Sequence, residues 1–156
     1  MIPSVSPDYP RVLTIGPSYF ESYQTFPRQK YIHGFNLGKN SAADRATLLQ
    51  SVAFACKALT NGKLLYWELG NEPDLFKTSA QGVVRPSSWT EKSYVTEWLS
   101  LKRSLKDEMK KQCPGSENVK WIAPSFAGTG NSLKPVKTWS EGLNADNDIA
   151  QFSSHK

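Results

Sequence analysis

The chain has 156 residues, of which 38% are hydrophobic and 12% aromatic, and its formal net charge is +5. This length suits about one domain, and this apolar content is typical of a folded globular protein rather than a disordered one. The positive charges are spread out, and their densest stretch, residues 100–111, also carries Asp107 and Glu108. We therefore expect a solvated helix face there and no nucleic-acid surface.

The sequence also argues against a membrane span and a zinc site. It contains no run of about 18 apolar residues, which a membrane-spanning helix needs. The first residues, "MIPSVSPDYPRVLTIG", lack the basic start and the long apolar core of a signal peptide, so either the protein is intracellular or its natural start lies elsewhere. Cys56 and Cys113 have no metal-ligand spacing, and no metal or cofactor is expected.

The first half of the chain predicts two strands and a helix. The β-branched run at residues 12–15 predicts a strand followed by a loop, and residues 31–36 predict a second strand. Ser41 is a good helix N-cap, and Asp44 can complete the cap and favour the helix dipole. Apolar residues then recur at helical spacing as far as Leu59, before a closing Thr-Asn-Gly.

The second half continues the alternation of strands and helices. It predicts a strand at 64–69, a loop of about fifteen residues, a helix at 87–112, a strand at 119–123, a short helix within 133–143 and a last strand at 148–156. Such alternation predicts an α/β fold with a parallel sheet, either an open doubly wound sheet or part of a (β/α)8 TIM barrel. No glycine-rich phosphate loop follows a strand, so nucleotide binding has little support.

The length decides between a complete barrel and a partial one. A full barrel needs about 250 residues, and this chain stops within a predicted strand. We therefore expect residues 1–156 to form one partial barrel domain, truncated at both ends, with no second domain.

The stretch "LLYWELGNEPDLF", residues 64–76, carries the clearest chemistry. An apolar strand ends there in Asn71, Glu72 and Pro73, and ligands of parallel α/β proteins bind at the carboxyl ends of strands. Partial burial of Glu72 against Trp67 and Tyr66, which are near it in sequence, would favour the protonated form of the carboxylic acid, which a general acid needs. Asn71 can donate a hydrogen bond to a sugar hydroxyl. The alternative is that these residues form an ordinary polar turn.

Several stretches resemble one enzyme family. "WELGNEPDLF" is similar to the acid/base motif of glycoside hydrolases with (β/α)8 barrels, in which Asn-Glu-Pro closes the fourth strand. "TIGPSYFESYQTFP", "YIHGFNLGKN" and "FSSHK" resemble glycoside hydrolase family 79, the β-glucuronidases and heparanase-like enzymes, and especially its fungal members. The resemblance implies about strands 3 to 6 of the barrel, a retaining reaction on β-linked glucuronic acid residues of glycans, no cofactor, and an extracellular location.

The resemblance also implies roles for individual residues. Glu72 would be the general acid/base, and Asn71 would bind the 2-hydroxyl of the sugar. Asn36 and His155 would line the same pocket, although a strand-end turn and a satisfied histidine are equal alternatives for these two. Tyr66 and Trp67 precede the strand end and are expected in the core.

The second catalytic carboxylate is not found. A retaining glycosidase needs a nucleophile about 5–5.5 Å from its acid/base, and the family carries it on the seventh strand. Glu21, expected in the loop after the first strand, could lie near the rim of the pocket, but nothing matches it to the nucleophile. Five other glutamates are expected on helices or helix starts, namely Glu91, Glu97, Glu108, Glu117 and Glu141. We expect the isolated chain to expose sheet edges and apolar interior, to be unstable or aggregate, and to hydrolyse no glycoside.

Two further questions stay open from sequence. The chain is either part of such an enzyme or a non-catalytic carbohydrate-binding or interaction fragment, and an enzyme of the same clan acting on neutral sugars also fits. A carbohydrate is the expected partner, without nucleic acid or membrane. Cys56 and Cys113, at the ends of consecutive helices, fit either a disulfide, which would agree with secretion, or two reduced buried thiols.

Overall fold

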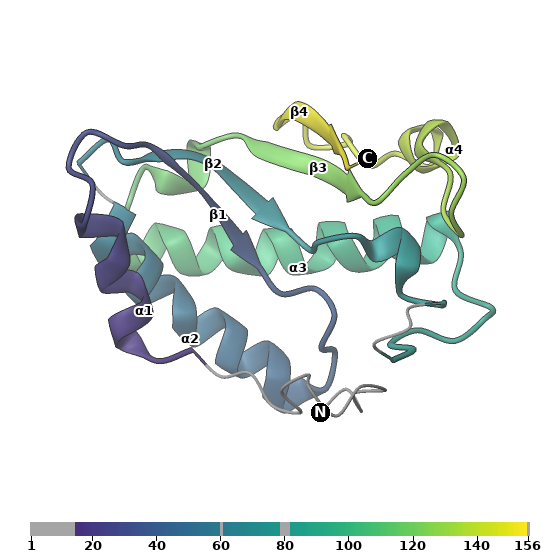
Figure 1. Ribbon diagram of the computed structural model, residues 1–156, viewed down its shortest axis with the longest axis horizontal. Helices are drawn as coiled ribbons and strands as arrows, with labels where there is room; N and C mark the ends of the chain where they lie inside the picture. Colours follow the sequence, from purple (N-terminus) through teal and green to yellow (C-terminus); the bar gives the residue numbers. More distant parts are fainter. Residues whose placement is uncertain (1–14, 60, 79–81, 156) are drawn as a thin grey trace.

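The computed structural model describes residues 15–59, 61–78 and 82–155. Their sheet has four strands in the order β1 (Tyr31–Phe35), β2 (Leu64–Leu69), β3 (Trp121–Phe126) and β4 (Ile149–Ser154). Each neighbouring pair is parallel, and the arrows of β1, β2 and β3 run the same way in Figure 1. In this described part, consecutive strands are neighbours without the reversal that a doubly wound sheet shows. The α/β prediction is confirmed, and the order is compatible with part of a (β/α)8 barrel.

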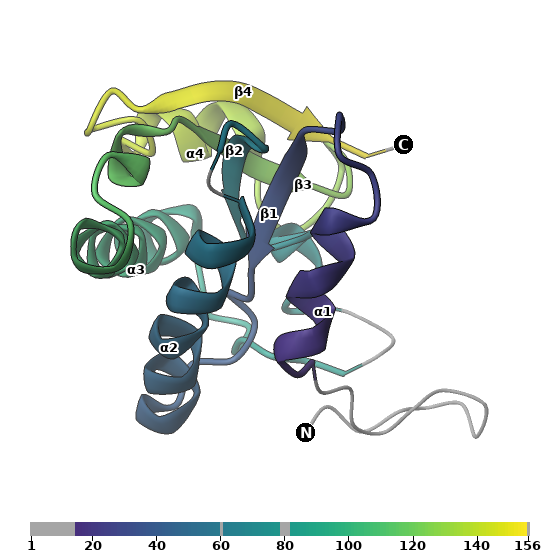
Figure 2. The ribbon, with the colours of Figure 1, turned by 90° about the vertical axis from the view of Figure 1, so that its left-hand side faces the viewer.

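Helices cover one face of this sheet. The long helices α2 (Ala42–Leu59) and α3 (Glu91–Gln112) pack against each other on the same side of the strands (Figures 1 and 2). The shorter elements are α1 (Pro17–Glu21), η1 (Ser22–Gln24), η2 (Pro73–Leu75), η3 (Ser116–Asn118) and α4 (Pro135–Ser140). Among the residues described, no helix has the length and apolar character that crossing a membrane requires.

Aromatic side chains fill the space between sheet and helices. Alternate strand residues point to opposite faces, and Trp67 and Leu69 of β2 both point to the helices and are buried. The Trp67 ring lies 6.4 Å from Trp121 of β3 and 5.4 Å from Phe35 of β1. Trp98 of α3 completes the layer, and its indole N–H donates to the carbonyl of Leu69. Burial of such large rings dominates the energetics of a core.

The helix caps are largely as predicted. The N–H of Asp44 donates to Ser41 Oγ at 3.1 Å, and Ser41 Oγ donates to the Asp44 carboxylate at 2.6 Å. The hydroxyl of Thr90 accepts from the N–H of Ser93, so α3 begins at Glu91. The helix therefore starts later than the predicted residue 87, and Trp89 lies just before it.

Two predictions near strand ends differ from the structure, and a third lies mostly outside the described residues. The strand predicted at 12–15 lies outside the described residues except for Ile15. The loop predicted after it is wrong, because α1 and η1 occupy it. Pro17 opens α1, where a missing N–H costs nothing, and Phe20 stacks on Phe54 of α2. Strand β3 starts later than predicted because Val119 caps η3.

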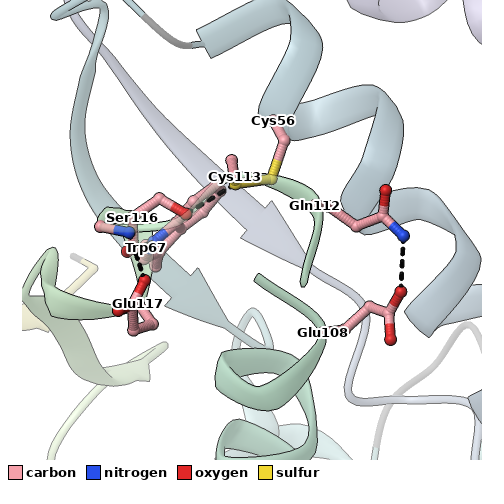
Figure 3. The surroundings of a disulfide bond; sticks show 8 residues. Cys56, Trp67, Glu108, Gln112, Cys113, Ser116 and Glu117 are labelled. Carbon is pink, nitrogen blue, oxygen red and sulfur yellow. Dashed lines mark hydrogen bonds between the residues drawn. A yellow bond between two sulfur atoms is a disulfide. The ribbon is translucent and has the colours of Figure 1, made fainter. Parts of the chain in front are cut away.

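Cys56 and Cys113 are joined by a disulfide, which decides between the two alternatives (Figure 3). Cys56 lies in the last turn of α2, and Cys113 is the C-cap of α3. Their Cα atoms are 5.7 Å apart, within the ordinary range for a disulfide. The bridge holds the carboxyl ends of the two long helices together.

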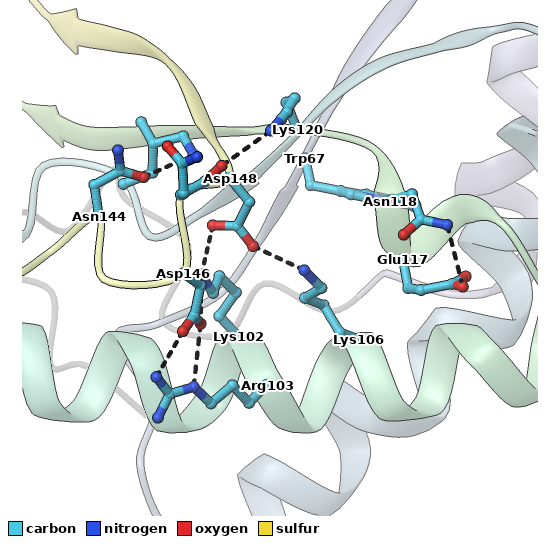
Figure 4. Close-up of polar contacts among 12 residues, drawn as sticks. Trp67, Lys102, Arg103, Lys106, Glu117, Asn118, Lys120, Asn144, Asp146 and Asp148 are labelled. Atoms are coloured by element: carbon cyan, nitrogen blue, oxygen red, sulfur yellow. Dashed lines mark hydrogen bonds and ion pairs between the residues drawn. The ribbon is translucent and has the colours of Figure 1, made fainter.

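A buried lysine fixes the start of β4. The ammonium group of Lys102, on α3, is fully buried and lies 2.6 Å from Asp148 and 2.9 Å from Asp146 (Figure 4). Lys106 binds the second oxygen of Asp148 at 2.8 Å. Burial alone would raise the pKa of Asp148, but hydrogen bonds from both lysines outweigh it and hold that pKa below its ordinary value. The network therefore attaches β4, which leads to His155, to the helix layer.

Candidate functional site

The turn after β2 is held by the two neighbouring strands. Gly70 has φ +85°, and a Cβ there would lie 2.9 Å from Cβ of Leu37, so only glycine fits without a shift. Its N–H donates to the carbonyl of Phe35, the last residue of β1, and the N–H of Glu72 donates to the carbonyl of Ser125 in β3, both at 2.8 Å. The backbone of the Asn-Glu-Pro turn is therefore bound on both sides at the carboxyl edge of the sheet.

Glu72 and His155 meet at this edge. Glu72 Oε1 lies 2.8 Å from His155 Nδ1, and the N–H of His155 donates to the carbonyl of Phe126 at the end of β3. The two side chains are 35% and 40% exposed, so a ligand can reach both. Glu72 adopts φ 51° and ψ 47°, a left-handed conformation that is uncommon for non-glycine residues and recurs at functional sites.

The expected contact between Glu72 and Trp67 is wrong. Trp67 points to the helices, and its indole N–H donates to the carbonyl of Ser116 before the start of β3, at the amino edge of the sheet. Trp67 is a core residue, as predicted. The neighbour of the Glu72 carboxylate is instead His155, the last residue that the structure describes.

Asn36 and Asn71 share a cavity of about 350 Å³ beside the turn. The cavity lies between the ends of β1 and β2, and Phe76 and Val84 from the loop after β2 also line it. Asn36 Oδ1 also accepts from the N–H of Gly38 at 2.7 Å, so this residue both forms a strand-end turn and lines the cavity. The predicted site residues thus form two groups at the edge of the sheet. Asn36 and Asn71 line the cavity, whereas Glu72 contacts His155. The two groups are adjacent, because Asn71 and Glu72 are consecutive residues.

Glu68 also lines this cavity, and the sequence reasoning missed it. Ser125 Oγ donates a hydrogen bond to Glu68 Oε1. A Cβ on Gly34 would lie 3.5 Å from Glu68 Oε2. The alternation of strand residues could have indicated it. Trp67 and Leu69 are apolar strand residues that share one face of the sheet, so Glu68 between them must face the other side.

A buried aspartate clamps the turn that follows Glu72. The carboxylate of Asp74 is fully buried and accepts from the backbone N–H groups of Ala127 and Gly128 and from the side-chain amide of Asn131. Three donors from one loop satisfy a carboxylate that burial would otherwise penalise. Helix η2 is therefore tied to the loop after β3.

Arg85 joins the two loops around the cavity. It is 3% exposed, and its guanidinium donates to the carbonyls of residues 37–38 and to Glu97 of α3. Its guanidinium carbon lies 5.4 Å from the ring centres of Phe76 and Trp89, within the range of cation–π contacts. The loops after β1 and β2 are thereby held at a fixed separation.

Five other glutamates lie on helices or at helix ends, as predicted. They belong to α3, to η3 or to the end of α4: Glu91, Glu97, Glu108, Glu117 and Glu141. Glu21, predicted at the pocket rim, is the exposed last residue of α1 and does not line the cavity. Across the described residues, no group of three or more His, Cys, Asp or Glu side chains has a metal-binding arrangement.

Two curated proteins are similar to this chain over nearly its whole length. It is 57% identical over 154 residues to a β-glucuronidase of Aspergillus niger, which covers 99% of this chain. It is 51% identical over 158 residues to a β-glucuronidase of Neurospora crassa, which covers 98% of this chain. The chain spans 28% of the length of each relative. No protein-family model matches it.

Proposed function

We propose that this chain is the acid/base-bearing part of a retaining glycoside hydrolase of family 79 that acts on β-linked glucuronic acid residues of glycans. One observation carries the proposal. Glu72 presents its carboxylate at the carboxyl edge of a parallel sheet, on His155, in a chain 57% identical to a β-glucuronidase. A (β/α)8 barrel, to which this sheet contributes about strands 3 to 6, supplies the remaining wall.

Each residue of the edge has a role in this reaction. Glu72 protonates the glycosidic oxygen as the aglycone leaves, and then takes a proton from the water that releases the sugar. His155 fixes the orientation of the Glu72 carboxyl group through the contact at 2.8 Å. Asn71 binds the 2-hydroxyl of the sugar, and Asn36 borders the same space. An extracellular location agrees with the disulfide.

The nucleophile comes from a later strand of the complete barrel. The glutamates on α3, η3 and α4 are held on the helical side or at its ends, so none replaces it. The 156-residue chain alone is therefore expected to hydrolyse no glucuronide. Turnover of an aryl β-glucuronide by the purified chain, lost in Glu72→Gln, would contradict this part of the proposal.

A hybrid enzyme tests the role of Glu72. In the hybrid, the matching 154-residue stretch of the Aspergillus niger relative is replaced by this chain. We expect β-glucuronidase activity, and we expect Glu72→Gln to lower kcat by about 10²–10⁴-fold on a glucuronide with a poor leaving group. With 4-nitrophenyl β-glucuronide, Glu72→Gln should slow the formation of the glycosyl-enzyme less, because this leaving group needs no proton.

Azide separates an acid/base role from general damage. Azide attacks the glycosyl-enzyme without a general base, so it should restore turnover of the 4-nitrophenyl substrate by Glu72→Gln and yield a β-glucuronyl azide. Glu141→Gln, at the exposed end of α4, is the matched control. A folded hybrid without activity, or Glu72→Gln with undiminished activity, would favour a non-catalytic carbohydrate-binding role.

A further inference from the structure

We propose that Glu68 is a ligand-contacting residue of this site, and that its Oε2 accepts hydrogen bonds from hydroxyl groups of the sugar. The inference rests on the proposed function, because it takes the cavity lined by Asn36, Glu68 and Asn71 to be the sugar site. It adds a second carboxylate, one that contacts substrate without transferring a proton.

The position of Glu68 supports this role. It lies on the face of β2 opposite the helices, and it lines the cavity of about 350 Å³ together with Gly34 and Asn71. Cavities of a few hundred Å³ with a small number of fixed polar groups are typical small-molecule sites. Glu68 therefore presents a carboxylate to a space of the size that a small molecule occupies.

Ser125 holds Glu68 and Glu72 in register. Its hydroxyl donates to Glu68 Oε1, and its carbonyl accepts the N–H of Glu72 at 2.8 Å. Ser125 is 2% exposed, so both contacts are shielded from solvent. One buried residue thus sets the carboxylate in the cavity and the backbone of the proposed acid/base together. Such fixed placement is what substrate positioning requires.

The free oxygen of Glu68 lacks a charged partner. Within the described residues, no lysine, arginine or histidine forms an ion pair with Glu68, and no group of acidic or histidine side chains holds a metal there. Gly34, facing Oε2, presents no side chain to it. A partly buried carboxylate needs hydrogen-bond donors, and the hydroxyl groups of a pyranose supply them, since a carboxylate oxygen only accepts.

The same charge orients the sugar. Glu68 would repel the carboxylate of a glucuronic acid placed beside it, because like charges at short range are unfavourable in a partly buried site. The neutral amides of Asn36 and Asn71 can both donate and accept. The hydroxyl-bearing edge of the sugar therefore faces Glu68, and its acidic group points away from β2.

Ligand-observed saturation-transfer NMR on the hybrid enzyme, in which the barrel is complete, tests the inference. The probe is phenyl 1-thio-β-D-glucuronide, a glucuronide whose thioether link resists hydrolysis. We expect Glu68→Gln, which keeps the size of the side chain, to weaken binding by about tenfold or more, since hydrogen bonds to charged groups are worth that much. Glu141→Gln, on the exposed end of α4, should bind as the unaltered hybrid does.

A second pair of variants tests the same cavity without touching Glu68. Gly34→Ala places a Cβ at an ordinary contact distance, 3.5 Å from Oε2, and should leave binding unchanged. Gly34→Val adds branches over Oε2 and should abolish it. This pair decides the question if Glu68→Gln does not fold.

The outcomes separate the two proposals. Binding by Glu68→Gln and Gly34→Val equal to that of the unaltered hybrid would overturn the role of Glu68 and leave the proposed function standing. Absence of binding by the unaltered hybrid would also overturn the role of Glu68, whereas the kinetics of Glu72→Gln decide the role of Glu72 independently. Loss of binding confined to Glu68→Gln and Gly34→Val would establish the role of Glu68.

Discussion

Glu72 and His155, 83 residues apart in the chain, meet at the carboxyl edge of the sheet with Oε1 and Nδ1 2.8 Å apart. The contact depends on two distant anchors. Ser125 of β3 fixes the backbone of Glu72, and the buried Lys102 network fixes the segment that begins β4. A change at Ser125 or at Lys102 should therefore alter the contact between Glu72 and His155, although neither Ser125 nor Lys102 contacts both of them.

Removal of His155 should weaken catalysis by the hybrid enzyme without changing the fold. We expect His155→Ala to lower kcat/KM by about 10–100-fold, because the Glu72 carboxyl group loses the partner that orients it. Ser154→Ala, on the adjacent exposed residue, is the control. Steady-state kinetics on a glucuronide with a poor leaving group, whose departure needs the proton of Glu72, provide the measurement. Equal rates for both variants would show that the contact is incidental.

Loss of the buried ammonium group should destabilise the chain. Lys102→Met leaves Asp148 buried with only Lys106, and removal of one partner from a buried ion pair costs about 3–5 kcal/mol. The exposed Lys110, on the same helix, pairs only with Asp107 at 3.0 Å, so Lys110→Met should change the unfolding free energy by less than about 0.5 kcal/mol. Urea unfolding followed by tryptophan fluorescence would compare them. Similar urea midpoints for Lys102→Met and Lys110→Met would contradict the expectation that the buried lysine contributes more to stability.

The disulfide should contribute to stability through the unfolded state. Its cysteines are separated by 57 residues, and a closed loop of that size corresponds to about 4 kcal/mol in the chain-entropy account. Double substitution of Cys56 and Cys113 by alanine should lower the unfolding free energy by about 2–4 kcal/mol. Intact mass should increase on reduction by one hydrogen for each sulfur. No change in mass would mean that the thiols are already reduced.

Much of this architecture follows from local sequence, and the rest depends on contacts between distant segments. The capped helix from Ala42 and strand β2 could be predicted because their periodicity is long and regular. The helical turn at Pro17 could not, since Phe20 is ordered by packing on α2. The turn at Glu72 could be predicted as a motif, and the resemblance placed His155 in the same pocket, but the contact between the two joins segments 83 residues apart. Glu68 could have been predicted from strand alternation, because it lies between Trp67 and Leu69, which face the helices.

The isolated chain should self-associate through its sheet edges. Strands β1 and β4 are the outer strands of the described sheet, and Ile32 and Phe152 on them are 45% and 48% exposed. Exposed edges with apolar side chains promote pairing between chains. Light scattering after size exclusion should show concentration-dependent oligomers, reduced by Phe152→Lys. Val83→Lys, in a loop, adds the same charge and should have no effect; a monomer at all concentrations would contradict the expectation.

Acid should destabilise the chain through a buried histidine. His33 is 3% exposed, its Nδ1 lies 2.8 Å from the hydroxyl of Tyr23, and burial lowers its pKa from 6.5 to about 4. Between those pH values the unfolded chain binds more protons at this histidine than the folded chain does. The contribution of neutral His33 to the unfolding free energy is therefore fully present above pH 6.5 and is lost as the pH falls toward 4. The loss attributable to His33 is about 3 kcal/mol.

The variant that tests this pH dependence replaces both partners. His33→Phe with Tyr23→Phe keeps aromatic packing against Trp67 and leaves no unpaired hydroxyl. Urea unfolding at pH 7 and at pH values down to about 4 should show a shallower loss of stability in the double variant, since the buried histidine no longer takes up a proton on unfolding. If the two chains lose stability in parallel, His33 is not responsible, and the acid sensitivity belongs to paired carboxylates such as Asp148, whose depressed pKa acts at lower pH.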